Sequence, residues 1–289
     1  MKTISLVINL DTRKGWLEDT TEEQQGFLAP GFSGTRSLDF LTDGVECKRR
    51  FFHNLPLEVI LYIDVHEPLP AHVLETLHGW QRDGKVDQLL FARHQKTWKD
   101  DFLPTWQDIN YLHALTLARG SYVAHFDADV AAFSPGQETV REWIDMLDDG
   151  RASFVSYPSR NTPGPVVDGS FDYWWASTRF FITKRENLED HTEIRRCLIP
   201  GDHLYRVYGD RQRKCPWMEH VLGIMADHAT KRRFSVHYPA LDYRKAMIWS
   251  WRRYRRGLYA SLMGMTYPQV VETVERWGGI GYPCDVMPG

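Results

Sequence analysis

The feature of this chain that most restricts its fold is a regular alternation of apolar, β-type segments with helical ones over about the first 130 residues. Apolar and β-branched runs predict strands over residues 4–9, 57–65, 86–94 and 121–126. Apolar residues at helical spacing predict the intervening helices over residues 37–51, 71–83 and 105–120. This order is typical of an α/β fold of the Rossmann type, in which helices cover a mostly parallel central sheet.

Three of the predicted strands end on or next to an aspartate, at Asp11, Asp64 and Asp127. A single aspartate at a strand end usually forms a turn or caps a helix. However, the carboxyl ends of parallel strands meet at one edge of the sheet, where proteins of this class bind ligands. We therefore expect the three carboxylates to share one site.

The fourth strand ends in a pair of aspartates, Asp127 and Asp129, within "SYVAHFDADV". Residues two apart in an extended backbone point roughly the same way, so the two carboxylates repel each other unless a cation lies between them. Mg²⁺ and Mn²⁺ prefer hard oxygen ligands and keep coordination positions open for phosphate oxygens. The pair therefore predicts a metal site that could neutralise a departing diphosphate.

The residues leading to this pair resemble those of the metal-dependent glycosyltransferases of the GT-A fold, especially the family 2-like group. The resemblance is carried by Asn110, Ala118, Gly120 and the Asp-x-Asp string, and more weakly by "WWASTRFFITKRENLED" and "WMEHVLGIMADHA". It covers roughly residues 1–240. Many relatives carry Glu-Asp in the last of these motifs, where this chain has Glu219-His220.

The resemblance implies a GT-A sandwich that moves a sugar from a nucleotide sugar, UDP-linked by expectation, to an acceptor hydroxyl with inversion. It implies that the donor is bound by Asp11, Arg13, Asp64, Asn110 and Asp127. It implies that Mn²⁺ or Mg²⁺ is held by Asp127, Asp129 and His237. For the general base it points first to Glu219, with Asp172 as the next candidate.

The sequence predicts a boundary near residue 240. Residues 1–133 would form the nucleotide-sugar half of a catalytic domain and residues 134–240 the acceptor half, followed by a helical extension over residues 241–289. The stretch "RKAMIWSWRRYRRGLY" in this extension carries six basic residues and no acid. Arginines with interleaved aromatics suit polyanions or anionic membrane surfaces. They predict a large anionic acceptor, such as hydroxymethylated DNA, a lipopolysaccharide or a lipid-linked sugar, bound by Arg252, Arg253, Arg255 and Arg256.

Composition restricts the remaining choices. The formal net charge of −3 means that the whole protein is not a polyanion binder. The four cysteines show no Cys-x-x-Cys pair, and no apolar run approaches the ~20 residues of a membrane span. A cytoplasmic protein without a transmembrane segment is therefore expected.

Three rival interpretations stay open. A haloacid-dehalogenase-type phosphatase also uses Mg²⁺ and an Asp-x-Asp pair, although normally on its first strand. A sugar-nucleotide pyrophosphorylase would need a Gly-rich, basic loop after the first strand, to which "LDTRKGWLED" is a poor match. A protein that only binds nucleic acid or a membrane surface through the arginine-rich tail would leave the aspartates unexplained.

Overall fold

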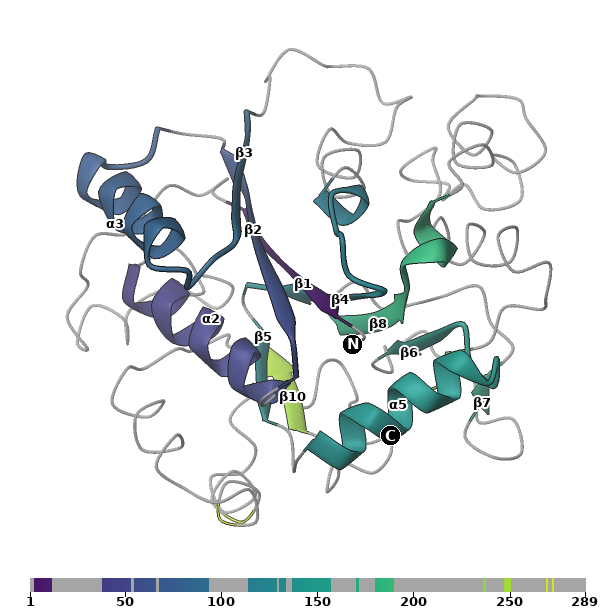
Figure 1. Cartoon of the computed structure of the whole chain (residues 1–289). Coiled ribbons are helices and arrows are strands. Elements are labelled where there is room, and N and C mark those ends of the chain that lie inside the picture. The colour runs from purple at the N-terminus through teal and green to yellow at the C-terminus, as the bar shows by residue number, and fades with distance from the viewer. Residues whose placement is uncertain are drawn as a thin grey trace, which may run out of the picture.

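The computed structural model describes residues 3–11, 38–52, 55–65, 68–93, 114–128, 130–133, 137–156, 170–171, 180–189, 236–237, 247–250, 269 and 272. Within them, eight strands form one sheet in the order β3-β2-β1-β4-β8-β6-β9-β7, and two form a small second sheet, β10-β5 (Figure 1). The elements of the first half are β1 (Ile4–Asp11), α2 (Leu38–Phe51), β2 (Leu57–Val65), α3 (Ala71–Arg82), β3 (Gln88–Arg93) and β4 (Tyr122–Asp127). Those that follow are β5 (Val130–Phe133), α5 (Gln137–Asp148), β6 (Phe154–Ser156), β7 (Ser170–Phe171), β8 (Phe180–Lys184), the 3₁₀ turn η1 (Arg185–Leu188), β9 (Val236–His237) and β10 (Met247–Ser250).

The centre of the large sheet is parallel, as the sequence predicts. Strand β1 pairs in parallel with β2 on one side and with β4 on the other, and β2 pairs in parallel with β3. Beyond β4 the sheet becomes mixed, because β8 runs antiparallel to both β4 and β6. The prediction of an α/β fold with a mostly parallel central sheet is confirmed.

One face of the sheet holds the hydrophobic core. Alternate strand residues such as Leu6, Leu61 and Phe126 belong to one buried cluster with residues of α2, α3 and α5. Aromatic rings join these elements, since Phe126 lies 4.6 Å from Phe180 and 5.5 Å from Phe51 between ring centroids. Such pairs contribute roughly 0.5–1.5 kcal/mol each beyond their buried area. This packing fixes α2 and α5 against β1 and β4, whose carboxyl ends carry the predicted site.

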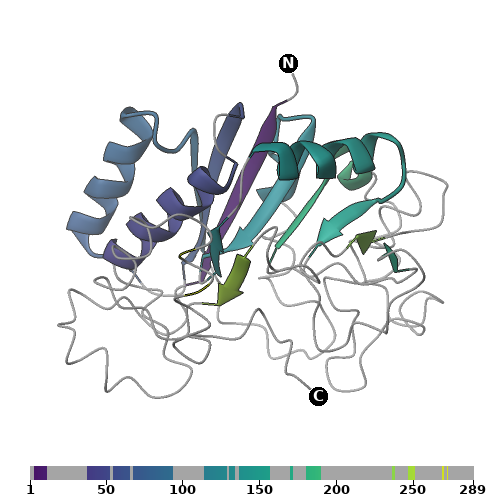
Figure 2. The same ribbon diagram turned by 90° about the horizontal axis from the view of Figure 1, so that it is seen from below.

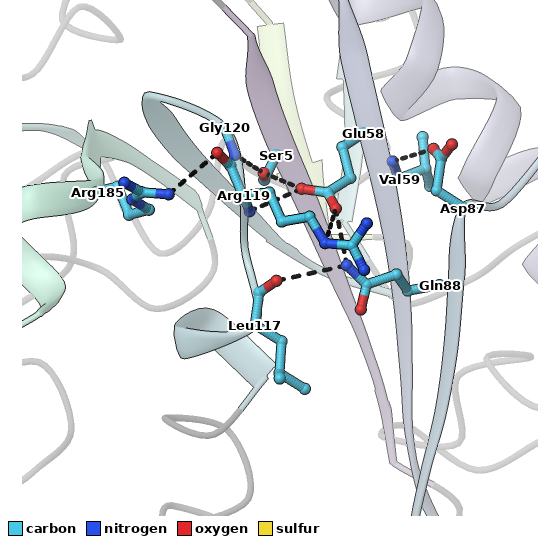
Figure 3. Close-up of polar contacts among 9 residues, drawn as sticks. All are labelled: Ser5, Glu58, Val59, Asp87, Gln88, Leu117, Arg119, Gly120 and Arg185. Atoms are coloured by element: carbon cyan, nitrogen blue, oxygen red, sulfur yellow. Dashed lines mark hydrogen bonds and ion pairs between the residues drawn. The ribbon is translucent and has the colours of Figure 1, made fainter.

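A polar network fastens the opposite, amino-terminal edge of the parallel strands (Figure 3). The Glu58 carboxylate of β2 accepts hydrogen bonds from the Ser5 hydroxyl of β1, from Gln88 Nε2 of β3 at 2.7 Å and from the Arg119 backbone N–H at 2.9 Å. The Gly120 N–H donates in turn to Ser5 Oγ at 2.8 Å. One carboxylate therefore aligns the starts of β1, β2 and β3 with the turn that leads into β4.

This network affects the protonation of Glu58. Burial raises the pKa of Glu58, but the hydrogen bonds from Ser5, Arg119 and Gln88 and the Arg119 charge outweigh burial. The pKa of Glu58 therefore lies below its ordinary value of 4.5. A carboxyl group with a lowered folded-state pKa stabilises the fold above its unfolded-state pKa, and this contribution is lost as the pH falls through the folded-state value.

We expect Glu58→Gln to lower the free energy of unfolding by about 1–3 kcal/mol at pH 7, because the amide cannot accept from all these donors. The difference from the wild type should shrink as the pH falls below about 4.5. Urea unfolding at pH 7 and pH 3.5 checks both statements. The control is Glu46→Gln, which breaks a partly exposed pair with Arg50 and should cost only a few tenths of a kcal/mol. A Glu58→Gln effect that does not change with pH would contradict this account.

The structure differs from the sequence-based expectation in the carboxyl-terminal part. Residues 247–250 were expected in a helical extension but form strand β10, which pairs antiparallel with β5. The sequence "MIWS" is rich in strand-forming residues, and β5 needs a partner for its backbone groups. The helix expected over residues 105–120 is helical only at residues 114–116 within its described part. The charged segment over residues 184–198 also predicts a helix, but it is described only as far as residue 189 and forms the short η1 there. The segment "WMEHVLGIMADHA" (residues 217–229), whose sequence also predicts a helix, lies outside the described residues, and the boundary near residue 240 stays a prediction.

Candidate active site

The candidate site lies at the carboxyl ends of β1, β2 and β4. From β1 the chain passes to β2 and β3 on one side and then returns to place β4 on the other side of β1. Such a reversal of strand order is the switch point at which open α/β sheets bind ligands. The register places Asp11 opposite Asp64, and it pairs Asn9 with Asp127. The backbone positions of the three predicted aspartates therefore lie together at this edge.

Asp127 ends β4 with a carboxylate that is 34% exposed. Behind it, on the same face of the strand, His125 is fully buried and stacks on Phe181 with ring centroids 5.5 Å apart. His125 Nε2 lies 3.9 Å from Asp127 Oδ1. The Asp127 carboxylate is thus partly exposed to solvent at the edge of the sheet, and one of its oxygens lies near the buried His125 imidazole.

The turn after Asp127 is held from two directions. The Ala128 N–H donates to the Asn9 carbonyl of β1 at 2.8 Å. The Ala128 carbonyl accepts a hydrogen bond from Lys48 Nζ of α2 at 3.0 Å, and Lys48 is fully buried. Both peptide groups of this residue, which separates the two predicted metal ligands, are therefore fixed by the fold.

The tail reaches the same edge. In the β5–β10 ladder Ser250 pairs with Val130, the residue that follows Asp129. Figure 2 shows β10 at the carboxyl ends of the parallel strands. Ser250 therefore lies beside the residue that follows Asp129, and in the sequence it precedes Arg252 by two residues.

Several predicted site residues lie outside the described residues: Arg13, Asn110, Asp129, Asp172, Glu219, Arg252, Arg253, Arg255 and Arg256. Asp11, Asp64 and His237 are described only in their backbone. His237 of β9 pairs with Val155 of β6, and β9 lies three strands away from β4. At about 4.8 Å between neighbouring strands this is ~14 Å, so the register does not bring His237 to Asp127. Its role as a metal ligand stays a prediction without support from the backbone.

Three polar residues of this region were not predicted from the sequence: Asn9, Lys48 and His125. Each has a signal, because each interrupts an apolar pattern. Lys48 occupies a position on the apolar stripe of α2 that includes Leu41 and Val45, and Asn9 and His125 lie inside apolar strands. A polar residue at a core position usually has a structural or functional partner.

The described residues at this edge allow a test of whether a hard divalent cation suits it. Asp127 has a partly exposed carboxylate, the ligand type that Mg²⁺ and Mn²⁺ prefer, and the register brings the backbones of Asp11 and Asp64 to the same edge. Beside Asp127, the buried Asn9 Oδ1 has no hydrogen-bond partner among the described residues. A buried acceptor without a donor is costly, and a cation-bound water would supply that donor. Among the side chains that the structure describes, no group of three or more His, Cys, Asp and Glu forms a metal site by itself.

Comparison with known proteins gives the following findings. No known family and no curated protein matches the chain. Among solved structures, a TarS fragment of S. aureus in complex with UDP-GlcNAc has a TM-score of 0.41 and 14% identity over 83% of this chain and 56% of that chain. A cytidylyltransferase from Leptospira borgpetersenii has a TM-score of 0.43 and 11% identity over 95% and 94% of the two chains. A putative nucleotide-diphospho-sugar transferase from Desulfovibrio desulfuricans G20 has a TM-score of 0.40 and 10% identity over 93% and 99%.

Scores at this level establish neither a family nor a function for this chain. The chain also spans only 35% of the longer TarS chain that it matches. Across the described part of the chain, no helix has the length and hydropathy needed to cross a membrane.

Proposed function

We propose that this protein is a metal-dependent glycosyltransferase that moves a sugar from a nucleotide sugar to an acceptor hydroxyl. The observation that carries the proposal is the register at the switch point, which pairs Asn9 with Asp127 and Asp11 with Asp64. In an open α/β sheet this edge receives the nucleotide. Clustered carboxylates there suit a cation that accompanies a diphosphate.

Each residue then has a role in the proposed reaction. Asp127 and Asp129 would hold Mn²⁺ or Mg²⁺, which supplies positive charge to the departing diphosphate. The nucleoside would lie against Asp11, Arg13, Asp64 and Asn110. Glu219 would take the proton of the acceptor hydroxyl, with Asp172 as the second candidate for this base, and direct displacement would invert the sugar. The pH dependence of transfer tests the base assignment.

A panel of nucleotide sugars tests the proposal directly. The protein should release a nucleoside diphosphate from at least one of them, UDP-sugars first, and only when Mn²⁺ or Mg²⁺ is present. Phosphate release from phosphomonoesters would instead support the dehalogenase-type phosphatase. No turnover of either class, together with tight binding of nucleic acid or anionic vesicles, would support a binding protein.

We propose further that the arginine-rich tail holds an anionic acceptor. The support is the pairing of Ser250, which lies inside this stretch, with Val130, the residue that follows Asp129. Candidate acceptors are hydroxymethylated DNA, a lipopolysaccharide and a lipid-linked sugar. A cytoplasmic location remains an expectation of the sequence.

Changing Arg252, Arg253, Arg255 and Arg256 together to Gln should weaken transfer to such an acceptor by about tenfold or more, while hydrolysis of the donor persists. Transfer by the wild type should also fall with salt, and for duplex DNA each lost phosphate contact lowers the slope of log affinity against log salt by roughly 0.9. Transfer and hydrolysis assays at 50 and 200 mM salt measure both effects.

The control is the double change of the exposed Arg82 and Arg151 to Gln, which keeps the tail intact. Loss of hydrolysis together with transfer would assign the tail arginines to the donor side or to packing. Unchanged transfer would show that they do not bind the acceptor.

A further inference from the structure

A fully buried lysine lies directly behind the aspartate turn. Lys48 has 0% exposure, and its Nζ lies 3.0 Å from the Ala128 carbonyl oxygen and 3.4 Å from the Gly44 carbonyl oxygen. Removing an ammonium group from water is unfavourable, so a lysine in a core needs a compensating role. The contact with the Ala128 carbonyl joins α2 to a turn that is 80 residues away in the sequence.

Two neighbouring residues, Gly44 and Asn9, lie close to the contact between Lys48 and Ala128. A Cβ at Gly44 would lie 3.4 Å from both the Ala128 oxygen and Lys48 Nζ, at the near limit of ordinary van der Waals contact, so Gly44 borders this contact directly. On the other side, the Ala128 N–H is held by the Asn9 carbonyl at 2.8 Å. Lys48 and Asn9 thus fix both peptide groups of Ala128, the residue that directly follows Asp127.

We infer that Lys48 is a positioning residue for the turn through Ala128 that carries the Asp127 carboxylate, an inference that rests on the proposed function of that turn. Without a cation, Asp127 and Asp129 repel each other, and a free turn would move them apart. Because Lys48 holds the turn in advance, cation binding does not have to order it, and a preorganised site binds more tightly.

The test uses Lys48→Met, which keeps most of the side-chain volume and removes the donor. In the metal-free protein, amide hydrogen exchange around Ala128 should become at least about tenfold faster. The dissociation constant for Mn²⁺, measured by calorimetry and expressed per folded molecule, should rise by about tenfold, as expected when a hydrogen bond of a charged group is lost. If Lys48→Met does not fold, Lys48→Gln, whose donor is one bond shorter, replaces it in both measurements.

The matched control is Val45→Ala on the same helix, which removes buried apolar contact without removing a hydrogen bond to the turn. It should lower the melting temperature but change neither local exchange at Ala128 relative to the rest of the sheet nor the Mn²⁺ affinity. A merely structural role of Lys48 would give the same pattern as Val45→Ala, and this result would overturn the inference.

Removing a positive charge would by itself favour cation binding. A Lys48→Met variant that binds Mn²⁺ as well as the wild type, or more tightly, would therefore overturn the positioning role and leave the proposed function intact. If the wild type binds no Mn²⁺ and hydrolyses no nucleotide sugar, the proposed function itself fails, and the role of Lys48 toward a cation fails with it.

Discussion

Asp129→Asn is expected to remove metal-dependent binding of the nucleotide sugar while the protein stays folded. An amide has the shape of the carboxylate but no charge with which to hold a cation against a diphosphate. Loss of groups that only support a metal ligand already costs about 10–100-fold in affinity or activity. We therefore expect at least ~10³-fold loss of activity from the loss of a ligand itself. Calorimetry with and without Mn²⁺ measures the affinity, and a nucleotide-release assay measures the activity.

The control for this variant is Asp149→Asn, which makes the same chemical change at the exposed end of α5. It should leave donor binding and turnover unchanged. Because Asp129 follows a turn held by Lys48 and Asn9, the melting temperature of Asp129→Asn should stay close to that of the wild type. Unchanged metal-dependent affinity would show that Asp129 is not a ligand and would remove one of the two predicted carboxylate ligands from the proposed metal site.

Gly120→Ala is expected to destabilise the fold by about 3 kcal/mol or more. A Cβ at this position would lie 2.6 Å from the Thr3 carbonyl oxygen, 2.7 Å from the Ser5 nitrogen and 2.8 Å from Ser5 Oγ. The two nearest are backbone atoms of β1 and of the residue before it, so relief requires β1 and β4 to separate. Forced overpacking typically costs 1–3 kcal/mol and more where the backbone must shift. Urea unfolding at pH 7 measures the effect.

Gly79→Ala provides a control of opposite sign. Gly79 lies inside α3, and the nearest atom to a new Cβ would be the flexible end of Arg82 at 3.7 Å. Alanine is favoured over glycine inside a helix by roughly 0.8–1 kcal/mol, so this variant should be slightly more stable than the wild type. If Gly120→Ala were tolerated equally well, the close approach of the Gly120 turn to β1 would be wrong.

The Gly120→Ala result also shows whether the glycine of the Ala-x-Gly turn serves the proposed site or the packing between strands. The Ala-x-Gly turn contributes to the resemblance to glycosyltransferases, yet Gly120 lies at the amino-terminal edge of the sheet with Ser5 and Glu58 (Figure 3). The proposed site lies at the other end of the strands. The glycine is therefore required for packing between strands, and its effect on activity should follow its effect on folding.

The sequence by itself determined the architecture and the approximate ends of its main elements. Strands β1, β2 and β4 and helices α2 and α3 lie within a few residues of the predicted ranges. Local periodicity suffices for these elements because an amphipathic helix or an apolar strand is specified by neighbours a few residues apart. The sequence also placed Asp11, Asp64 and Asp127 at one edge, because parallel strands share the direction in which they end.

Only the tertiary structure decided which residues meet at that edge. Lys48 reaches Ala128 across 80 residues, Asn9 pairs with Asp127 across β1 and β4, and Ser250 pairs with Val130. These partners are chosen by strand order and register, which depend on how the whole sheet packs and not on local spacing. Residues 247–250 were expected to be helical for the same reason, because the partner strand β5 cannot be recognised from local spacing. Pairing with β5 makes these residues a strand instead.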